Sequence, residues 1–206
     1  LGCPSIRFDF RGCGESSGRE EDFCIDSALE DLNAVIQWAQ HDAGHRSIIL
    51  LGESYGGTIA VLGHQPKIVT GMILLWPALK LAETSFKELF TRESRIESMI
   101  KDQPYVLFDG HKLGSHFLND IYTTDLTGAL ENITVPTLIQ HGTADDDVPL
   151  EQARFASTHL RGMIDLGGLA GGNHGSRSTT MRQYLFMNIR HFMERVFKTL
   201  DLQPKN

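Results

Sequence analysis

A serine between two glycines stands where a predicted strand gives way to a predicted helix. The pentapeptide Gly52-Glu53-Ser54-Tyr55-Gly56 follows a run of isoleucine and leucine and precedes a helical pattern. This context is that of a nucleophile elbow, a sharp turn that exposes a serine hydroxyl above the end of a sheet. We expect both flanking glycines to be required, because side chains there would collide with neighbouring backbone. The alternative is an ordinary turn in which Ser54 caps the helix.

A serine hydroxyl becomes a good nucleophile only with a general base, and the base needs an acid that orients it. Asp145 follows a predicted strand at residues 135–140, and His174 lies in a glycine-rich loop after the last predicted strand. The order serine, acid, histidine differs from the orders of the two common serine protease classes. Asp146 and Asp147 compete with Asp145 for the role of the acid, and the sequence leaves that choice open.

Other candidate sites are weaker. His111 and His116 lie in a predicted insertion and could face a substrate, whereas histidines on or beside predicted helices are expected at the surface or in structural roles. No histidine pair shares a helical face with a nearby carboxylate, so we expect no metal site. The glycine-rich segment 11–18 lacks the third glycine of a dinucleotide fingerprint and the lysine of a phosphate-binding loop. The proposed chemistry needs no metal or organic cofactor.

The composition limits the possible partners. The 206-residue chain is 41% hydrophobic and 22% charged, with a net charge of -7. This acidic balance disfavours nucleic acid as a partner, and no apolar run approaches the roughly 18 residues of a membrane span. The cysteines Cys3, Cys13 and Cys24 are odd in number, which disfavours a disulfide framework. No signal-peptide pattern opens the chain at Leu1, so we expect a cytoplasmic location.

Short apolar runs alternate with longer amphipathic ones, which predicts an α/β fold with a mostly parallel sheet and helices on both faces. We expect the runs beginning at residues 47 and 68 to be buried on both faces of that sheet. The predicted strands are 5–10, 47–51, 68–76, 135–140 and 162–166, and the predicted helices are 26–40, 54–63, 150–160 and 179–200. The core is expected to comprise residues 1–77 and 131–206.

Residues 78–130 break the alternation and are predicted to form a lid inserted between two strands. Insertions after the carboxyl end of a strand lie on the same side as the elbow, so we expect this one to cover Ser54. At least one of its aromatic side chains should line an apolar pocket there; the alternative is that most of them hold the insertion onto the sheet. These candidates are Phe86, Phe90, Tyr105, Phe108, Phe117 and Tyr122.

Three motifs, in residues 7–18, 52–57 and 141–149, together with His174, resemble the α/β-hydrolase superfamily. The resemblance is to its serine-aminopeptidase-like group, which includes monoacylglycerol lipases, cinnamoyl and feruloyl esterases and acyl thioesterase-like enzymes. The first motif is similar to the strand-4 loop of the family, the second to its elbow and the third to its acid loop. The family commonly has histidine where Cys13 and Glu53 stand here.

The resemblance implies a serine hydrolase that cleaves small carboxylic esters or thioesters through an acyl-enzyme. Ser54 would be the nucleophile, His174 the base and Asp145 the acid, while the backbone N–H of Tyr55 would supply one oxyanion donor. In the family, further strands and a second donor loop precede strand 4, so that region is expected to be absent here, at a cost of about 10²–10³ in rate. The alternatives are a small peptidase or amidase and a catalytically impaired hydrolase-fold protein; the sequence does not indicate an oligomeric state.

Overall fold

The computed structural model describes residues 3–86, 104–176 and 178–201. Their internal contacts divide the chain into two compact units. The first, called the sheet unit here, comprises residues 1–4, 46–79 and 126–206, and the second, the hairpin unit, comprises residues 5–45 and 80–125. The predicted boundaries after residues 77 and 130 are not those of the two units, because 78–79 and 126–130 belong to the sheet unit; the division into core and lid stays a prediction.

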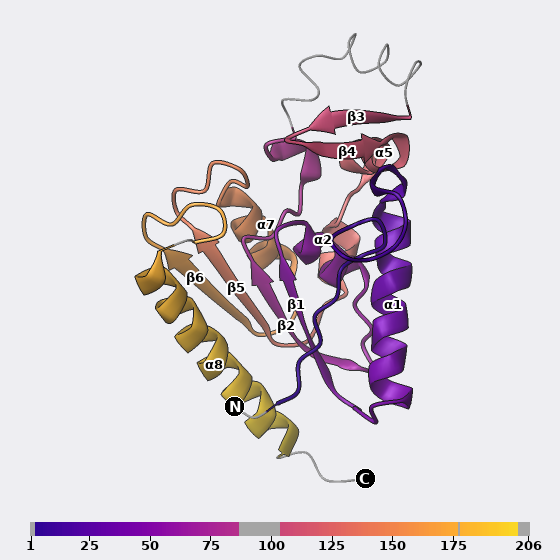
Figure 1. The fold of residues 1–206 in the computed structure, drawn as a ribbon. Helices are drawn as coiled ribbons and strands as arrows, with labels where there is room; N and C mark the ends of the chain where they lie inside the picture. Colours follow the sequence, from indigo (N-terminus) through magenta and orange to yellow (C-terminus); the bar gives the residue numbers. More distant parts are fainter. Residues whose placement is uncertain (1–2, 87–103, 177, 202–206) are drawn as a thin grey trace. The chain divides into compact units, whose positions relative to one another are not determined.

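The sheet unit contains four parallel strands in the order β1-β2-β5-β6 (Figure 1). These strands are β1 (Ile48–Glu53), β2 (Val69–Leu75), β5 (Thr137–Gly142) and β6 (Ile164–Leu169). The chain therefore returns to the same end of the sheet before each strand, as parallel pairing requires. Because the strands are parallel, the carboxyl ends of β1, β5 and β6 lie at the same end of the sheet. The loops that follow these strands can therefore bring distant side chains together.

Helices cover both faces of this sheet (Figure 1). Alternation along β2 turns Ile73 and Leu75 towards α8 (Thr179–Asp201), whose Phe192 and Val196 share one buried cluster with them. On the other face, Leu74 lies against Gly57 of α2 (Tyr55–Leu62). The remaining helices of the unit are α6 (Thr127–Glu131) and α7 (Glu151–His159). The predicted α/β class is thereby confirmed.

The hairpin unit contains α1 (Ile25–His41), α5 (Ser115–Thr123) and an antiparallel hairpin of β3 (Tyr105–Phe108) and β4 (His111–Gly114). In the described part of this unit, the 3₁₀ turns are η1 (Glu20–Asp22) and η2 (Leu81–Glu83). Asp109 and Gly110 connect β3 and β4 with φ angles of 47° and 82°. Two successive positive φ angles give the turn whose twist matches that of a hairpin, which explains the Asp-Gly sequence.

Most predicted elements are confirmed with shifts of one to three residues at their ends. The predicted helices correspond to α1, α2, α7 and α8, and four predicted strands correspond to β1, β2, β5 and β6. The predicted burial of β1 on both faces is wrong. In the described sheet β1 has β2 as its one paired neighbour, and Leu51 is 54% exposed.

The strand predicted at residues 5–10 is also wrong, because the described residues have no strand there. Alternation of apolar and polar side chains is not sufficient, since a strand also needs a neighbour that accepts its backbone hydrogen bonds. The segment instead ends in turns: Cys13 N–H donates to Phe10 O, and the Asp9 carboxylate accepts the N–H of Glu15.

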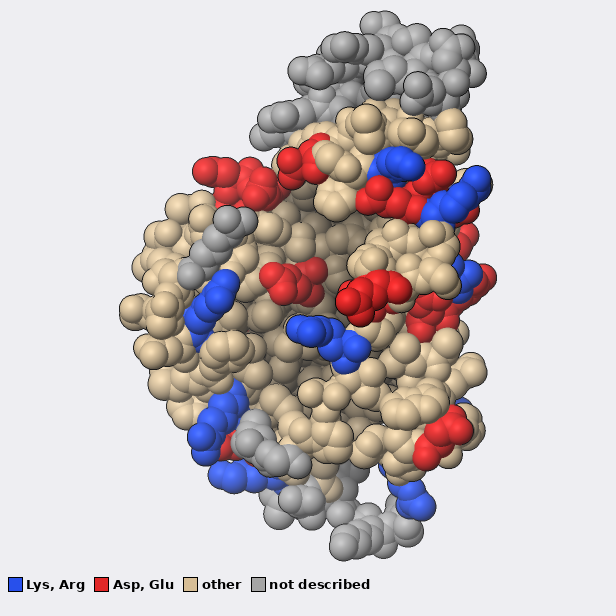
Figure 2. All heavy atoms as spheres, in the orientation of Figure 1, with Lys and Arg blue, Asp and Glu red and all other residues tan. Residues whose placement is uncertain are grey.

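Among the described residues, no helix is both long and apolar enough to span a membrane. Acidic residues outnumber basic ones in the chain, which has a net charge of -7. On the face drawn in Figure 2, the Lys and Arg side chains of the described residues stand in separate groups, some of them beside acidic ones.

Candidate active site

Ser54 occupies the turn between β1 and α2 with φ 53° and ψ −121°. A positive φ is unfavourable for a residue with a side chain and costs about 1–3 kcal/mol, so the surroundings must enforce it. Ser54 N–H donates to Leu75 O at 3.0 Å, while Ser54 O accepts the N–H groups of Gly57 at 2.9 Å and Ala78 at 3.0 Å. These bonds fasten the turn to the segment that follows β2.

The glycines around Ser54 have unequal roles. A Cβ atom on Gly52 would lie 2.3 Å from the carbonyl oxygen of Gly56, so Gly52 is required as predicted. The expectation for Gly56 is wrong, because an ideal Cβ there meets no described atom within 4 Å. The second required glycine is Gly57, whose Cβ would lie 2.6 Å from Cβ of Pro77. The steric demand therefore has two sources: the first turn of α2 crowds Gly52, and Pro77, which follows β2, crowds Gly57.

A chain of two hydrogen bonds joins the three predicted catalytic side chains. His174 Nε2 lies 3.0 Å from Ser54 Oγ, and His174 Nδ1 lies 2.9 Å from Asp145 Oδ2. Because a carboxylate only accepts, Nδ1 carries the proton and Nε2 is free to accept the serine hydroxyl proton. The other Asp145 oxygen accepts the N–H groups of Asp147 at 3.1 Å and Val148 at 2.9 Å.

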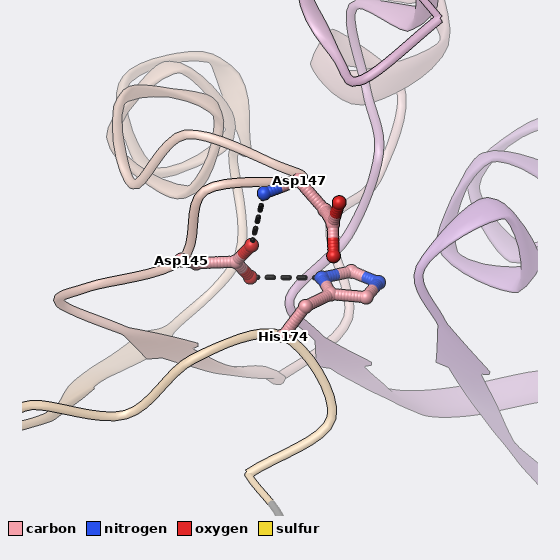
Figure 3. Close-up of side chains that lie close together, drawn as sticks. All are labelled: Asp145, Asp147 and His174. Carbon is pink, nitrogen blue, oxygen red and sulfur yellow. Dashed lines mark hydrogen bonds and ion pairs between the residues drawn. The ribbon is translucent and has the colours of Figure 1, made fainter.

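Figure 3 shows Asp145, Asp147 and His174, with Asp145 and not Asp147 joined to the imidazole by a hydrogen bond. The Asp145 side chain is fully buried, whereas Asp146 and Asp147 are exposed. The structure therefore separates the three adjacent carboxylates that the sequence left equivalent. One possible ligand atom from each of Asp145, Asp147 and His174 lies within 4.8 Å of the others, so these residues could hold a metal ion. Since Asp145 and His174 already share a hydrogen bond, we interpret the cluster as a proton-transfer site.

The loops that carry the acid and the base are bonded to each other. Thr143 N–H donates to Leu169 O at 3.0 Å, and Ala144 N–H donates to Gly172 O at 2.9 Å. In return, Gly171 N–H donates to the Thr143 hydroxyl at 2.8 Å. These bonds continue the β5–β6 pairing beyond the strands and fix the separation of the two loops.

His141 supports the acid and was missed by the sequence analysis as a candidate. It is fully buried in β5, its Nε2 donates to Val148 O at 2.8 Å, and the same nitrogen lies 3.5 Å from Asp145 Oδ2. Burial lowers the pKa of His141, so it is neutral near pH 7. The available signal was a histidine directly after the predicted strand 135–140, four positions before the acid.

The electrostatics match a base held beside a permanent anion. Burial alone would lower the pKa of His174, but the hydrogen bond and charge of Asp145, with the charges of Asp147 and Glu53, raise it above its usual value. For Asp145, burial opposes ionisation, yet the hydrogen bonds from His174 and Val148 bring its pKa below the usual value. Asp145 is therefore ionised at neutral pH.

The predicted substrate-facing aromatic residues lie in the hairpin unit or outside the described residues. Phe86 packs against Phe108 and Phe117, with ring centroids 5.4 and 5.5 Å apart. Lys112 Nζ lies 4.9 Å from the ring centroid of Tyr105, and Tyr122 is 54% exposed. Phe90 lies outside the described residues. The packing of Phe86 fits the structural alternative, and the predicted pocket above Ser54 stays a prediction.

The two histidines of the predicted insertion and Tyr55 complete the candidates. His111 Nδ1 lies 2.6 Å from a carboxylate oxygen of Glu20 within the hairpin unit, which favours a structural role. A role for His116 in substrate binding stays a prediction. Tyr55 is the first residue of α2 and directly follows Ser54. Its assignment to an oxyanion hole stays a prediction.

A parallel sheet with helices on both faces and a serine on a strand-to-helix turn define an α/β-hydrolase fold. Residues 2–125, more than half of the chain, match the family model described as "Serine aminopeptidase, S33". The AB hydrolase superfamily protein YisY of Bacillus subtilis (strain 168) is 31% identical over 206 residues, covering 83% of this chain and 74% of that protein. The chain belongs to this serine aminopeptidase family of the α/β-hydrolase superfamily.

Solved structures show the same fold. Est1E from Butyrivibrio proteoclasticus with bound ferulic acid matches with a TM-score of 0.77 and 23% identity, covering 92% of this chain and 76% of that one. A monoacylglycerol lipase from Paleococcus ferrophilus matches with a TM-score of 0.65 and 16% identity, covering 91% and 82%. The chain spans 46% of the length of the uncharacterized protein YfhR of Salmonella typhimurium, to which it is 26% identical over 155 residues.

The elbow packing predicts opposite outcomes for glycines that the sequence motif treats alike. Gly52→Ala and Gly57→Ala should lower the unfolding midpoint in urea, because each new methyl group collides with a rigid neighbour. Gly56→Ala should keep or raise the midpoint, since alanine is favoured over glycine in a helix by about 1 kcal/mol. Equal destabilisation by all three substitutions would contradict this account of the turn.

Proposed function

We propose that the chain is a serine hydrolase that cleaves carboxylic esters or thioesters through an acyl-enzyme. The single observation that carries the proposal is the continuous series of hydrogen bonds from Ser54 through His174 to Asp145. A structural serine has no need of an imidazole at hydrogen-bond distance backed by a fully buried carboxylate. This arrangement is that of an activated nucleophile with an oriented base.

In the first half of the proposed reaction, Ser54 Oγ attacks the carbonyl carbon while its proton passes to His174 Nε2. Asp145 stabilises the imidazolium that results, and it remains ionised throughout. The Tyr55 N–H donates to the oxygen on which negative charge develops. Collapse of the tetrahedral intermediate breaks the bond to the leaving oxygen or sulfur, which takes the proton from Nε2.

In the second half, water attacks the acyl-enzyme and gives a proton to His174 Nε2. The bond between the acyl carbon and Ser54 Oγ then breaks, and Oγ recovers that proton as the carboxylic acid leaves. Every proton therefore moves through one nitrogen, and the chain itself supplies all groups that transfer it. This is why the proposal includes no metal or organic cofactor.

Two solved structures of similar fold support an ester as the substrate. Est1E is similar in fold and has been seen with ferulic acid, and a monoacylglycerol lipase is also similar. We extend these likenesses to a small acyl or aryl ester for this chain. The family description as a serine aminopeptidase favours a peptide or amide substrate as the second candidate; an anilide substrate distinguishes the two.

The proposal predicts hydrolysis of p-nitrophenyl esters that depends on Ser54. Ser54→Ala should lower kcat/KM by at least about 10³-fold, because no other group on this path can form the acyl-enzyme. Ser176→Ala, at a buried serine outside this series of hydrogen bonds, is the control and should retain activity. Hydrolysis of p-nitroanilides in preference to the esters would favour the peptidase candidate. Ester hydrolysis by Ser54→Ala at the parental rate would refute the assignment.

The same assay with acetate, butyrate and octanoate esters examines the predicted apolar pocket. We expect medium acyl or aryl esters to be preferred over acetate, because pockets for such groups are mostly apolar. A flat profile from acetate to octanoate would contradict the pocket without affecting the role of Ser54.

The pH dependence follows from the charges that face His174, which are Asp145, Asp147 and Glu53, with neutral His141 behind Asp145. Since only unprotonated His174 accepts a proton, its raised pKa should place the acidic limb of kcat/KM above the usual histidine value of about 6.5. Asp147→Asn removes one nearby negative charge and should move the limb to lower pH. The neighbouring Asp146→Asn is the control. A limb below pH 6.5, or one that both variants leave in place, would contradict this account.

A further inference from the structure

Glu53, the residue before the nucleophile, contacts the segment that follows the neighbouring strand. It is the last residue of β1 and pairs in register with Leu75, the last residue of β2. The Glu53 carboxylate accepts the indole N–H of Trp76 with Oε1 and Nε1 3.1 Å apart. The last side chain of β1 and the first side chain after β2 are thereby joined immediately beside Ser54.

Trp76 needs such support because its backbone is unusual. Its φ is 36°, a conformation that is rare for a bulky residue and costs about 1–3 kcal/mol. The residue is 2% exposed, and its N–H donates to Gln140 O at 2.7 Å. The backbone hydrogen bond to Gln140 fixes the main chain of Trp76, and the Glu53 carboxylate holds the indole at Nε1.

The indole that Glu53 holds is a direct neighbour of the imidazole of His174. Their ring centroids lie 6.2 Å apart at an interplanar angle of 65°, an edge-on contact. The imidazole is bonded at Nδ1 to Asp145 and at Nε2 to Ser54, so both of its bonds lie near the ring plane. A fixed aromatic neighbour limits rotation of the ring about its Cβ–Cγ bond, which would move both nitrogens away from their partners.

We propose that Glu53 is a positioning residue that acts through Trp76: its carboxylate fixes the indole, and the indole holds the imidazole of His174 in line with Ser54. The inference rests on the proposed role of His174 as the base. It adds a second group that orients the imidazole: Asp145 bonds its Nδ1, and Trp76 contacts the ring. It also assigns a role to Glu53, which stands where the family commonly has histidine.

The alternative is that Glu53 acts through its charge alone, since it is one of the carboxylates that favour protonated His174. The two roles predict different effects of the conservative substitution. Glu53→Gln keeps an acceptor oxygen for the indole N–H and removes the charge, whereas Glu53→Ala removes both. Trp76→Phe keeps an aromatic ring and the Glu53 charge but removes the N–H donor.

The kinetic experiment compares these variants with the double variant Glu53→Ala/Trp76→Phe on a p-nitrophenyl ester at a pH on the plateau. Glu53→Ala and Trp76→Phe should each lower kcat about three- to tenfold, the usual effect of one lost hydrogen bond, with KM unchanged. Glu53→Gln should stay within about twofold of the parent. The double variant should be no slower than the slower single variant, because the two residues act as one unit.

Three kinetic results would overturn the inference: equal losses in Glu53→Gln and Glu53→Ala, an unaltered rate in Glu53→Ala, or multiplied losses in the double variant. The first would assign Glu53 a purely electrostatic role. The position of the acidic limb does not decide between the two roles, because loss of the Glu53 charge should move the limb to lower pH in either case. Thermal unfolding of each variant serves as the control for folding. A variant that is partly unfolded would lose activity through a smaller active fraction, and its unfolding midpoint would reveal this.

An NMR measurement on the same full chain does not depend on turnover and separates this inference from the proposed function. Relaxation of the His174 imidazole nitrogens should report a more mobile ring in Glu53→Ala and Trp76→Phe, and an unchanged ring in Glu53→Gln. Equal ring mobility in Glu53→Ala and the parent would refute the positioning role even if esters are cleaved. Absence of ester cleavage together with the predicted mobility changes would refute the function and leave the contact intact.

Discussion

The buried carboxylate of Asp145 is the group on which the arrangement of the site depends. Taking an ion out of water is costly unless its oxygens are satisfied, and here two backbone N–H groups bond one oxygen while His174 bonds the other. The same contacts that make the carboxylate tolerable therefore fix the tautomer and direction of the imidazole. His141 stabilises the loop that carries Asp145 by donating a hydrogen bond to Val148 O.

Parallel strand pairing explains why residues so distant in sequence can meet. The carboxyl ends of β1, β5 and β6 lie at the same end of the sheet, so the loops that follow them bring the serine, the acid and the histidine together. The positive φ angles of Ser54 and Trp76 are unfavourable locally. They persist because backbone hydrogen bonds to β2, β5 and α2 hold both turns, so the strain is concentrated where side chains must be presented and the rest of the sheet stays regular.

Much of this could be predicted from the sequence, because the decisive signals are local. The periodicity of residues 26–40 and 179–200 depends only on which face of a helix is apolar, and the glycine-rich elbow is a contiguous motif. Residues 5–10 show the limit: they alternate like a strand, yet alternation does not supply a hydrogen-bonded partner. Leu51 is misjudged for the same reason, because burial depends on what packs against β1.

The choice among Asp145, Asp146 and Asp147 and the roles of His141, Gly57 and Glu53 also required the structure. Most of these depend on a contact between segments that are distant in sequence, such as Gly57 against Pro77 or Glu53 against Trp76, whereas His141 depends on how the nearby loop places Asp145 and Val148 beside it. The motif favours Gly56 over Gly57, although of these two only Gly57 faces a rigid neighbour.

The most direct test of the central claim, that His174 activates Ser54, is to treat the folded chain with a fluorophosphonate and map the adduct by mass spectrometry of its peptides. The serine oxygen displaces fluoride from phosphorus and loses its proton to the base, so the reaction needs the hydrogen-bonded pair but no particular acyl group. The account predicts one adduct, on Ser54, that forms at least about 10³-fold more slowly in His174→Ala. An unmodified Ser54 in the folded parent, or equal labelling of the parent and His174→Ala, would contradict it.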